Sequence, residues 1–386
     1  MKIAIVICEV FGTVQFRRPI MELLVELGHD VYVIAPRDDY VSTLESIGVE
    51  FIDIEFDRYI NVWQDIKYVI SLYKIFKRER FDIVHTWTIK PNLYGPIVAF
   101  LAGNRRIFAS ITGLGYLFNE DPSIKIRITR AMVRKILFFS FRLCKCVTFQ
   151  NDDDGNQLVR EGVLSKEKVV VIKGSGVVLD NYSSVAVNTV VVETIRACYG
   201  ILESDIVVFM AARASESKGV NVLLEASRIL SSRDSRIRIF LAGEAGGDSI
   251  DSISEEVLKK NSGHHFAWVG FQKEIREWLA IADIVIYPSH YREGIPRFLL
   301  ESLAMGKPIV STNNVGCREV VDEGVNGYLV PIKDPMSLAR AVEKIITEDL
   351  FFKFGRESLV RSKAFDHRDV ARRMVALYEI LPQESS

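Results

Sequence analysis

The stretch Arg292-Glu293-Gly294-Ile295-Pro296 is followed, eight residues after its acid, by a second acid, Glu301. Glu293 lies in a Gly/Pro loop, whereas Glu301 lies inside the apolar run from Phe298 to Met305, which predicts a helix. Pro296 fits the first turn of that helix, and Gly294 lets the backbone come close to a ligand. The loop would direct N–H groups at an anion while the two carboxylates accept hydrogen bonds from hydroxyls. A nucleotide sugar, which carries a diphosphate and many hydroxyls, fits this description.

The spacing of the two acids indicates whether they form a binding site or the catalytic pair of a hydrolase. Eight helical residues span roughly 12 Å, whereas the two carboxylates of a glycosidase lie roughly 5–9.5 Å apart. The spacing therefore favours contact with two ends of a folded ligand over attack on one bond. A structural alternative stays open at this point, in which Glu293 caps the helix and Glu301 is solvated.

Length and composition indicate a soluble protein with two domains. The chain has 386 residues, of which 48% are hydrophobic and 26% charged. Its net charge of −1 argues against a general nucleic-acid partner. Five scattered cysteines suggest a reducing compartment, and Cys144-Lys145-Cys146 lacks the spacing of a zinc hook. No apolar run is long enough to span a membrane, and Met1–Ile7 predicts a buried strand instead of a signal peptide.

Short apolar runs alternate with helical patterns in two successive series, which predicts two doubly wound α/β domains with parallel sheets. The first series has strands at 3–7, 31–35, 83–85, 107–110 and 146–149 and helices at 18–26, 60–78, 94–102 and 124–143. The second has strands at 207–211, 237–242, 266–269, 284–287, 308–311 and 327–330 and helices at 220–231, 275–281, 297–305 and 335–347. Residues 177–189, which show no helical period, are expected to be the linker. The expected domains are 1–180, 190–365 and a C-terminal helix within 366–386, with a ligand cleft at the carboxyl ends of the strands.

Two cations follow the first strand of the second series. Arg213 and Lys218 lie five residues apart, between that strand and a predicted helix at Val220. With the helix N-terminus they can converge on phosphate oxygens. The alternative is a pair of solvated surface cations.

Several polar or Gly-rich positions follow strands of the first series. His85 would lie at a strand's carboxyl end, where it could contact a sugar or pack in the core. Lys90 follows it, and Gly113, Gly115 and Tyr116 follow the next strand; Gly12 and Thr13 follow the first strand and precede a helix. The acidic run after Asn151 predicts a helix N-cap with acids in the first turn, because consecutive residues do not converge on one metal ion.

Taken together, these motifs resemble glycosyltransferase family 4, whose members are retaining enzymes of the GT-B fold. The resemblance covers nearly the whole chain and rests on Glu293-x7-Glu301, Arg213-x4-Lys218-Gly219, Pro288-Ser289 and Asn326-Gly327, all in family order. The segments 85–92, 113–116 and 316–319 look like the bacterial branch that adds N-acetylgalactosamine or related sugars to polyprenyl-diphosphate acceptors. In a GT-B fold two Rossmann-like domains face each other, and the helix expected at 370–380 would cross back to the first domain.

The resemblance implies roles for most of the residues singled out. Arg213 and Lys218 would bind the donor diphosphate and stabilise it as it leaves, Glu293 and His85 would contact the donor sugar, and Glu301 would hold the ribose. The remaining donor contacts would come from Gly12, Thr13, Phe271, Gly294, Ile295, Pro296 and Arg297, and the acceptor contacts from Lys90, Gly113, Gly115 and Tyr116. Two cations can replace Mg²⁺ at the leaving group. We therefore expect no metal and no cofactor. The nucleotide sugar is a substrate, and we expect its nucleotide to be UDP.

A basic segment is hidden inside the nearly neutral chain. From Ile83 to Asn151 there are ten Lys/Arg and two Asp/Glu, an excess of +8, concentrated in residues 123–146 among large apolar side chains. Such a helix can lie in a membrane interface; alternatively it packs on the core with a solvated basic face. We expect attachment to an anionic membrane surface, with the protein cytoplasmic and on the inner face of the cell membrane. Two other functions stay open: a nucleotide-sugar epimerase of GT-B-like fold and an inactive nucleotide-sugar-binding subunit.

Overall fold

The computed structural model describes residues 1–57, 61–115, 124–247 and 251–379. The chain forms two compact units: unit 1 comprises Met1–Gly176 with His367–Ser386, and unit 2 comprises Val177–Asp366. Within the described ranges, no helix combines the length and the apolar character needed to cross a bilayer.

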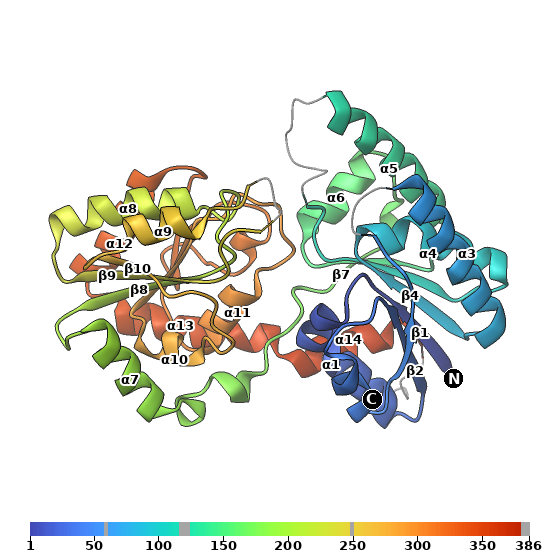
Figure 1. The fold of residues 1–386 in the computed structure, drawn as a ribbon, viewed down its shortest axis with the longest axis horizontal. Coiled ribbons are helices and arrows are strands. Elements are labelled where there is room, and N and C mark those ends of the chain that lie inside the picture. The colour runs from blue at the N-terminus through green and yellow to red at the C-terminus, as the bar shows by residue number, and fades with distance from the viewer. Residues whose placement is uncertain (58–60, 116–123, 248–250, 380–386) are drawn as a thin grey trace. The chain divides into compact units, whose positions relative to one another are not determined.

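Unit 1 is built on a parallel sheet in the order β3-β2-β1-β4-β5-β6-β7, covered by helices (Figure 1). Its central strands are apolar and buried on both faces, as parallel sheets require. The strand order reverses between β1 and β4, which is where ligands bind in such sheets. The strands are β1 (Lys2–Val6), β2 (Asp30–Ala35), β3 (Glu50–Asp53), β4 (Ile83–Trp87), β5 (Ile107–Ile111), β6 (Val147–Phe149) and β7 (Val169–Val171).

The helices of unit 1 include one from the far end of the chain. They are α1 (Val10–Glu26), α2 (Val41–Ser46), α3 (Val62–Glu79), α4 (Ile89–Ala102), α5 (Ile124–Leu143), α6 (Asp152–Arg160) and α14 (His367–Ala376). Helix α14 packs against α1 and buries Val370, Met374 and Val375 in the core of unit 1. The predicted cap of α6 is confirmed, because the Asn151 side chain accepts a hydrogen bond from the Asp154 N–H at 2.9 Å.

Unit 2 has the same kind of sheet, in the order β10-β9-β8-β11-β12-β13, with a reversal between β8 and β11 (Figure 1). The strands are β8 (Ile206–Ala211), β9 (Ile237–Ala242), β10 (Phe266–Trp268), β11 (Ile284–Tyr287), β12 (Ile309–Thr312) and β13 (Gly327–Val330). The helices are α7 (Thr189–Tyr199), α8 (Val220–Arg233), α9 (Glu255–Asn261), α10 (Arg276–Ile281), α11 (Arg297–Ala304), α12 (Pro335–Thr347) and α13 (Phe351–Ser362). The predicted fold class, two doubly wound parallel sheets, is confirmed.

Two details of the predicted organisation are wrong. Residues 177–189 are not a free linker: Val177 is buried in the core of unit 2, and a short 3₁₀ helix, η3 (Leu179–Tyr182), packs against α11. Helix α1 begins at Val10 instead of residue 18, with Pro19 inside it. Apolar side chains on both sides of that proline, Val10 and Met21 among them, are buried in the core of unit 1, so packing extends the helix beyond its proline.

Candidate functional site

A polar cluster lies at the carboxyl edge of the sheet of unit 2, where the strand order reverses between β8 and β11. Lys218 comes from the loop between β8 and α8, and Glu293 from the loop between β11 and α11. Their side chains form an ion pair with a distance of 2.6 Å between Nζ and Oε2, and both are largely buried. The hydroxyl of Tyr287, at the end of β11, accepts a hydrogen bond from Lys218 at 3.1 Å and donates one to Glu293 Oε1 at 3.0 Å.

Two buried hydroxyls hold the Glu293 carboxylate in one orientation. Ser289 is fully buried, and its Oγ donates to Glu293 Oε1 at 2.8 Å. Burial, and then the Glu293 carboxylate, raise the pKa of Tyr287 well above its ordinary value, so this phenol remains a hydrogen-bond donor. Glu293 does not cap α11, because Pro296 occupies the N-cap and α11 has no side-chain cap. The alternative of a capping role is therefore wrong.

Glycines bring the two loops of the cluster into contact. Gly219 has a φ of +81°, and a Cβ there would lie 2.1 Å from the carbonyl oxygen of Pro288. Gly316 also has a φ of +81°, and its Cβ would lie 1.8 Å from the carbonyl oxygen of Gly294. The backbone N–H groups of residues 290 and 291 donate to the Ser217 carbonyl at 2.9 and 3.0 Å. No larger residue fits at Gly219 or Gly316 without moving these loops.

The second acid lies in a separate polar group. Glu301, on α11, is 7% exposed and accepts a hydrogen bond from Arg297 Nε at 2.6 Å, one helical turn earlier. The alternative in which Glu301 is solvated is therefore wrong. Tyr182, from η3, belongs to the same group: burial and then the Glu301 carboxylate raise its pKa. The two acids thus have different partners.

The other predicted donor residues of unit 2 surround these two groups. Arg213 is exposed after β8 and lowers the pKa of Tyr287, against the larger effect of burial. Phe271 is 61% exposed in the loop after β10. Gly294, Ile295 and Pro296 form the buried approach to α11. Pro296 is the N-cap of that helix and not, as predicted, in its first turn.

Two alternatives were open for His85, contact with a sugar or packing in the core, and the structure shows the second. It is fully buried in β4, where Nδ1 lies 2.5 Å from the hydroxyl of Tyr378 and Nε2 lies 2.7 Å from Ser110 Oγ. Burial lowers the pKa of His85 to about 3, with a smaller contribution from Arg17. The side chain is therefore a neutral core histidine with both nitrogens hydrogen-bonded. The prediction that His85 contacts the donor sugar directly is wrong.

The first loop also differs from its prediction. Gly12 and Thr13 lie inside α1, both buried, instead of in a loop that precedes a helix. The Thr13 hydroxyl donates to the Glu9 carbonyl at 2.9 Å, and the Gly12 carbonyl accepts from Arg17 Nη1 at 3.1 Å. Both residues belong to the first turns of α1. The prediction that Gly12 and Thr13 form a loop that approaches a diphosphate is therefore wrong.

The predicted acceptor residues have mixed outcomes. The Lys90 ammonium forms an ion pair with Asp65 Oδ1 at 2.6 Å, and both side chains are largely buried. Contact between Lys90 and an acceptor stays a prediction. Gly113 and Gly115 both have positive φ, 138° and 64°, and give the loop after β5 its path. Tyr116 lies outside the described residues.

Sequence reasoning missed four residues that the structure brings to these sites. Tyr287 and Tyr182 contact the two acid groups, and Arg17 and Trp87 line a pocket in unit 1. Tyr287 is the last residue of a predicted strand, directly before Pro288-Ser289, and that position could have been a signal. Trp87 lies in the segment 85–92 on which the family resemblance partly rests, but that pattern does not single out its side chain. Arg17 and Tyr182 carry no local pattern that separates them from ordinary core or surface residues.

Comparisons with known proteins place the chain among sugar-transferring enzymes. Residues 191–358 match the family model described as glycosyl transferases group 1, and residues 19–174 match the model described as glycosyltransferase family 4. A curated relative from Campylobacter jejuni, N,N'-diacetylbacillosaminyl-diphospho-undecaprenol alpha-1,3-N-acetylgalactosaminyltransferase, is 28% identical over 366 residues, covering 94% of each chain. An Escherichia coli relative, UDP-Gal:alpha-D-GlcNAc-diphosphoundecaprenol alpha-1,3-galactosyltransferase, is 26% identical and covers 81% of this chain and 78% of its own.

Solved structures share the fold over the whole chain. HepE of Anabaena in complex with UDP has a TM-score of 0.79 at 18% identity and covers 99% of this chain and 100% of its own. A glycosyltransferase from Rickettsia africae has a TM-score of 0.78 at 22% identity and covers 99% of both chains. At these identities the likeness establishes the fold.

Proposed function

Because the chain belongs to glycosyltransferase family 4, we propose that it transfers a sugar from a UDP-sugar to a saccharide carried on a polyprenyl diphosphate. The chain is a transferase with the GT-B fold. The names of its Campylobacter and Escherichia coli relatives both include a diphospho-undecaprenol acceptor, and these names support the proposed acceptor class. An N-acetylhexosamine is the proposed sugar, in keeping with the Campylobacter relative, which covers most of the chain.

The observation that carries the donor assignment is the Lys218–Glu293 pair at the carboxyl edge of β8 and β11. It supplies a largely buried cation for the diphosphate next to a carboxylate that can accept hydrogen bonds from hydroxyls. Glu293 would accept hydrogen bonds from the donor sugar, and Glu301, in its separate group, would accept them from the ribose. Phe271, the backbone of Gly294–Pro296 and the Arg297 side chain would border the nucleotide.

The proposed chemistry follows from charge. A departing UDP gains negative charge, and fixed cations aimed at it stabilise the transition state, which is often the largest catalytic contribution. Lys218 would provide this stabilisation with the exposed Arg213, which can move to the phosphate oxygens. We propose that the reaction retains the anomeric configuration and proceeds without a metal ion.

The acceptor would be bound by unit 1, with Gly113 and Gly115 shaping the loop after β5. His85 acts through its hydrogen bonds to Ser110 and Tyr378 in this proposal, as a positioning residue without substrate contact.

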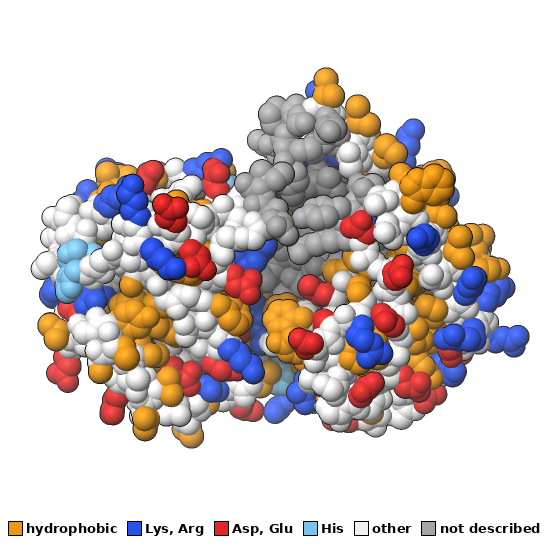
Figure 2. Space-filling model, viewed as in Figure 1, with side chains coloured by type: hydrophobic (Ala, Val, Ile, Leu, Met, Phe, Trp, Pro, Cys, Tyr) orange, Lys and Arg blue, Asp and Glu red, His pale blue; other side chains and the backbone are white. Residues whose placement is uncertain are grey.

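The surface of α5 supports the proposal that the protein attaches to the cytoplasmic leaflet. One face of α5 is buried through Val133, Leu137 and Phe141, while Ile128, Met132 and Phe139 are each about 60% exposed. Exposed basic side chains alternate with these apolar ones at Arg127, Lys135, Arg142 and Lys145. Apolar and basic side chains lie together along this edge of unit 1 (Figure 2). Both features are typical of a helix in a membrane interface.

The exposed apolar surface continues beyond the predicted segment onto α3. Trp63 is 78% exposed, and Ile66, Ile70 and Tyr73 follow it at helical spacing with exposed fractions of 41–49%. Helix α4 packs against both α3 and α5, so the two exposed faces belong to one side of unit 1. Tryptophan and tyrosine favour the level of lipid headgroups.

The function is tested by incubating the full-length protein with a panel of UDP-sugars and a polyprenyl-diphosphate saccharide. We expect transfer of an N-acetylhexosamine, with the anomeric configuration of the donor retained in the product by NMR. Absence of transfer from every donor to every such acceptor would contradict the proposal and favour an inactive binding subunit.

Two further arms separate the remaining alternatives. Donor alone should stay unchanged, whereas an epimerase would convert its sugar without an acceptor. EDTA should leave the rate unchanged; activity lost in EDTA and restored by Mg²⁺ would overturn the proposed independence from metal.

A further inference from the structure

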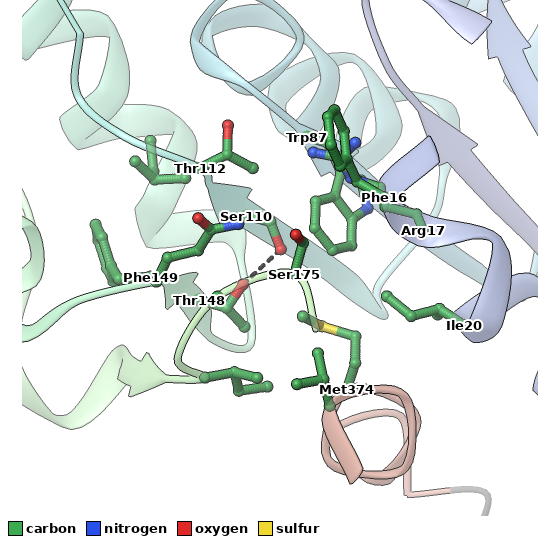
Figure 3. Close-up of a pocket in the computed structure, with 15 residues that line it drawn as sticks. Phe16, Arg17, Ile20, Trp87, Ser110, Thr112, Thr148, Phe149, Ser175 and Met374 are labelled. Carbon is green, nitrogen blue, oxygen red and sulfur yellow. Dashed lines mark hydrogen bonds between the residues drawn. The ribbon is translucent and has the colours of Figure 1, made fainter. Parts of the chain in front are cut away.

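A pocket opens at the carboxyl ends of β4, β5 and β6 in unit 1, between α1 and α14 (Figure 3). It encloses about 350 Å³ of empty space, part of it open to solvent. Its polar lining comes from Arg17, Trp87, Ser110, Thr112, Thr148, Gln150 and Ser175. The pocket adjoins the β1/β4 reversal of strand order, where doubly wound sheets bind ligands.

Arg17 is a buried charge without a counter-charge. Its side chain is 7% exposed, and no carboxylate among the described residues forms an ion pair with it. One nitrogen, Nη1, donates to the Gly12 carbonyl, and the guanidinium stacks 4.6 Å from the centre of the Trp87 ring. Its Nε is buried and has no hydrogen-bond partner. Burial lowers the pKa of Arg17 to about 10, so the side chain is charged at neutral pH.

A second donor at the same pocket is also unmatched. Trp87 is 5% exposed, and its Nε1 is buried without an acceptor among the described residues. Arginine and tryptophan nitrogens can only donate, so both groups require an acceptor atom. Buried donors almost always have a partner in folded proteins. Two unmatched donors on one pocket therefore point to a ligand that accepts hydrogen bonds.

The remaining polar lining is uncharged, and two of its hydroxyls belong to one chain of hydrogen bonds. Ser110 Oγ lies 2.5 Å from Thr148 Oγ1 and 2.7 Å from His85 Nε2, and His85 contacts Tyr378 on its other side. This chain of hydrogen bonds fixes the two hydroxyls at the pocket wall. No Asp or Glu is among the described residues that line the pocket. A single positive charge without an acid favours an anionic ligand.

We propose that this pocket is an oxyanion subsite, in which Arg17 and Trp87 bind a phosphate of a diphosphate substrate. The inference rests on the proposed function and deepens it. The donor diphosphate is already assigned to Lys218 and Arg213 of unit 2, so the phosphate in this pocket belongs to the lipid-linked acceptor. Arg17 and Trp87 are then specificity-determining residues for that acceptor.

Titration calorimetry with inorganic pyrophosphate tests the subsite on the full chain, with saturating UDP present to occupy the donor site. We expect binding of pyrophosphate to the wild type, and a loss of affinity of about ten-fold or more in Arg17→Gln and in Trp87→Phe. Trp87→Phe keeps an aromatic ring on which Arg17 can stack and removes the N–H donor together with part of the indole. Arg18→Gln is the matched control: Arg18 is next in sequence, partly exposed and paired with Glu22 on the surface, so its removal should change nothing.

Kinetics distinguish the two sources of phosphate. In both pocket variants the KM for the polyprenyl-diphosphate acceptor should rise by about ten-fold, with the KM for UDP-sugar unchanged. A rise in the donor KM alone would overturn the assignment to the acceptor. No pyrophosphate binding by the wild type, or wild-type affinity in both variants with melting temperatures preserved, would overturn the subsite itself. Since the calorimetric arm needs no transfer, its result is independent of whether the proposed reaction occurs.

Discussion

Lys218 and Glu293, separated by 75 residues of sequence, form a 2.6 Å ion pair in which each side chain is at most 14% exposed. The cation proposed for the diphosphate is thus balanced by the carboxylate proposed for the sugar. Removing one partner leaves the other charge buried and unbalanced. The pair should therefore act as one unit in catalysis.

Lys218→Met and Glu293→Gln should each lower kcat/KM for transfer by roughly 10²–10³, the loss typical of removing one preorganised charge-stabilising group. The double variant should lose little more than either single one, since the residues act together. Steady-state rates measure both effects. Lys259→Met is the control, because Lys259 pairs with Glu255 on the exposed surface; equal losses in this control would refute a specific role for Lys218.

Glu301→Gln should weaken recognition of the ribose. The variant keeps the shape of the side chain but loses the charge that Arg297 pairs with. Inhibition constants for UDP and for 2′-deoxy-UDP should differ by about ten-fold in the wild type and converge in Glu301→Gln, as expected for one hydrogen bond to a charged group. Equal inhibition of the wild type by both nucleotides would place the ribose elsewhere.

Gly219→Ala should damage the site through sterics. The new Cβ would collide with the Pro288 carbonyl, 2.1 Å away. Gly324→Ala is the matched control: Gly324 has a similar φ of +73°, but no atom lies within 4 Å of the Cβ that alanine would add there. We expect Gly324→Ala to cost about 1 kcal/mol of stability and to leave activity unchanged. Gly219→Ala should lower both stability and transfer rate further, as measured by urea unfolding and kcat; indistinguishable variants would argue against the close loop packing.

His85 should make the stability of unit 1 depend on pH. Its pKa is about 3 in the folded chain against 6.5 ordinarily, so below pH 6.5 the unfolded state binds a proton that the folded state does not. Stability is therefore lost as the pH falls from 6.5 towards 3, by about 1.4 kcal/mol at pH 5.5. Urea unfolding at pH 7.5 and 5.5 should show a smaller drop in His85→Asn than in the wild type. The exposed His264→Asn variant should match the wild type, and a full-sized drop in His85→Asn would contradict the assignment.

Neutralising the exposed face of α5 should release the protein from anionic vesicles. Each cation near such a surface contributes about 1 kcal/mol, so Gln at Arg127, Lys135 and Arg142 together should weaken binding by roughly 10². Sedimentation with phosphatidylglycerol vesicles at low salt measures this. The same change at Lys259, Lys260 and Lys273, exposed in unit 2, controls for net charge. A wild type that does not sediment with the vesicles would reject membrane attachment.

Most of the fold could be predicted from the alternation of apolar runs and helical patterns, because buried parallel strands have few other sequence solutions. Several of the missed elements are short, such as β3, β7 and α2, but two helices of 11 and 12 residues, α7 and α13, were missed as well. Tertiary contacts decide them: β7 has only three residues and exists by pairing with β6. The segment 177–189 looked like a linker because Val177, the one residue of it that the structure describes as buried, has no periodic partner nearby in sequence.

The candidate site was predictable where motif and topology coincide. Lys218 and Glu293 follow strands that turned out to be neighbours, so their meeting follows from the sheet order. His85 was misplaced because the end of a strand does not specify which way a side chain points, and its partner Tyr378 lies 293 residues away. Arg17 and Arg18 are neighbours of the same residue type, so the sequence does not distinguish them. The orientation of α1 buries the side chain of Arg17 and leaves that of Arg18 largely accessible.

The return of α14 to unit 1 has a consequence for how the protein is made. Tyr378 contributes one of the largest fully buried side chains of the chain and hydrogen-bonds a residue of β4, yet it is among the last described residues to be synthesised. Unit 2 is continuous in sequence and can fold as soon as it leaves the ribosome. Unit 1 must wait, with the core beneath α14 uncovered, until α14 has been translated after the whole of unit 2. A premature stop after Asp366 and no later than Tyr378 would thus remove core residues from the first unit while leaving residues 177–366, which form the second, complete.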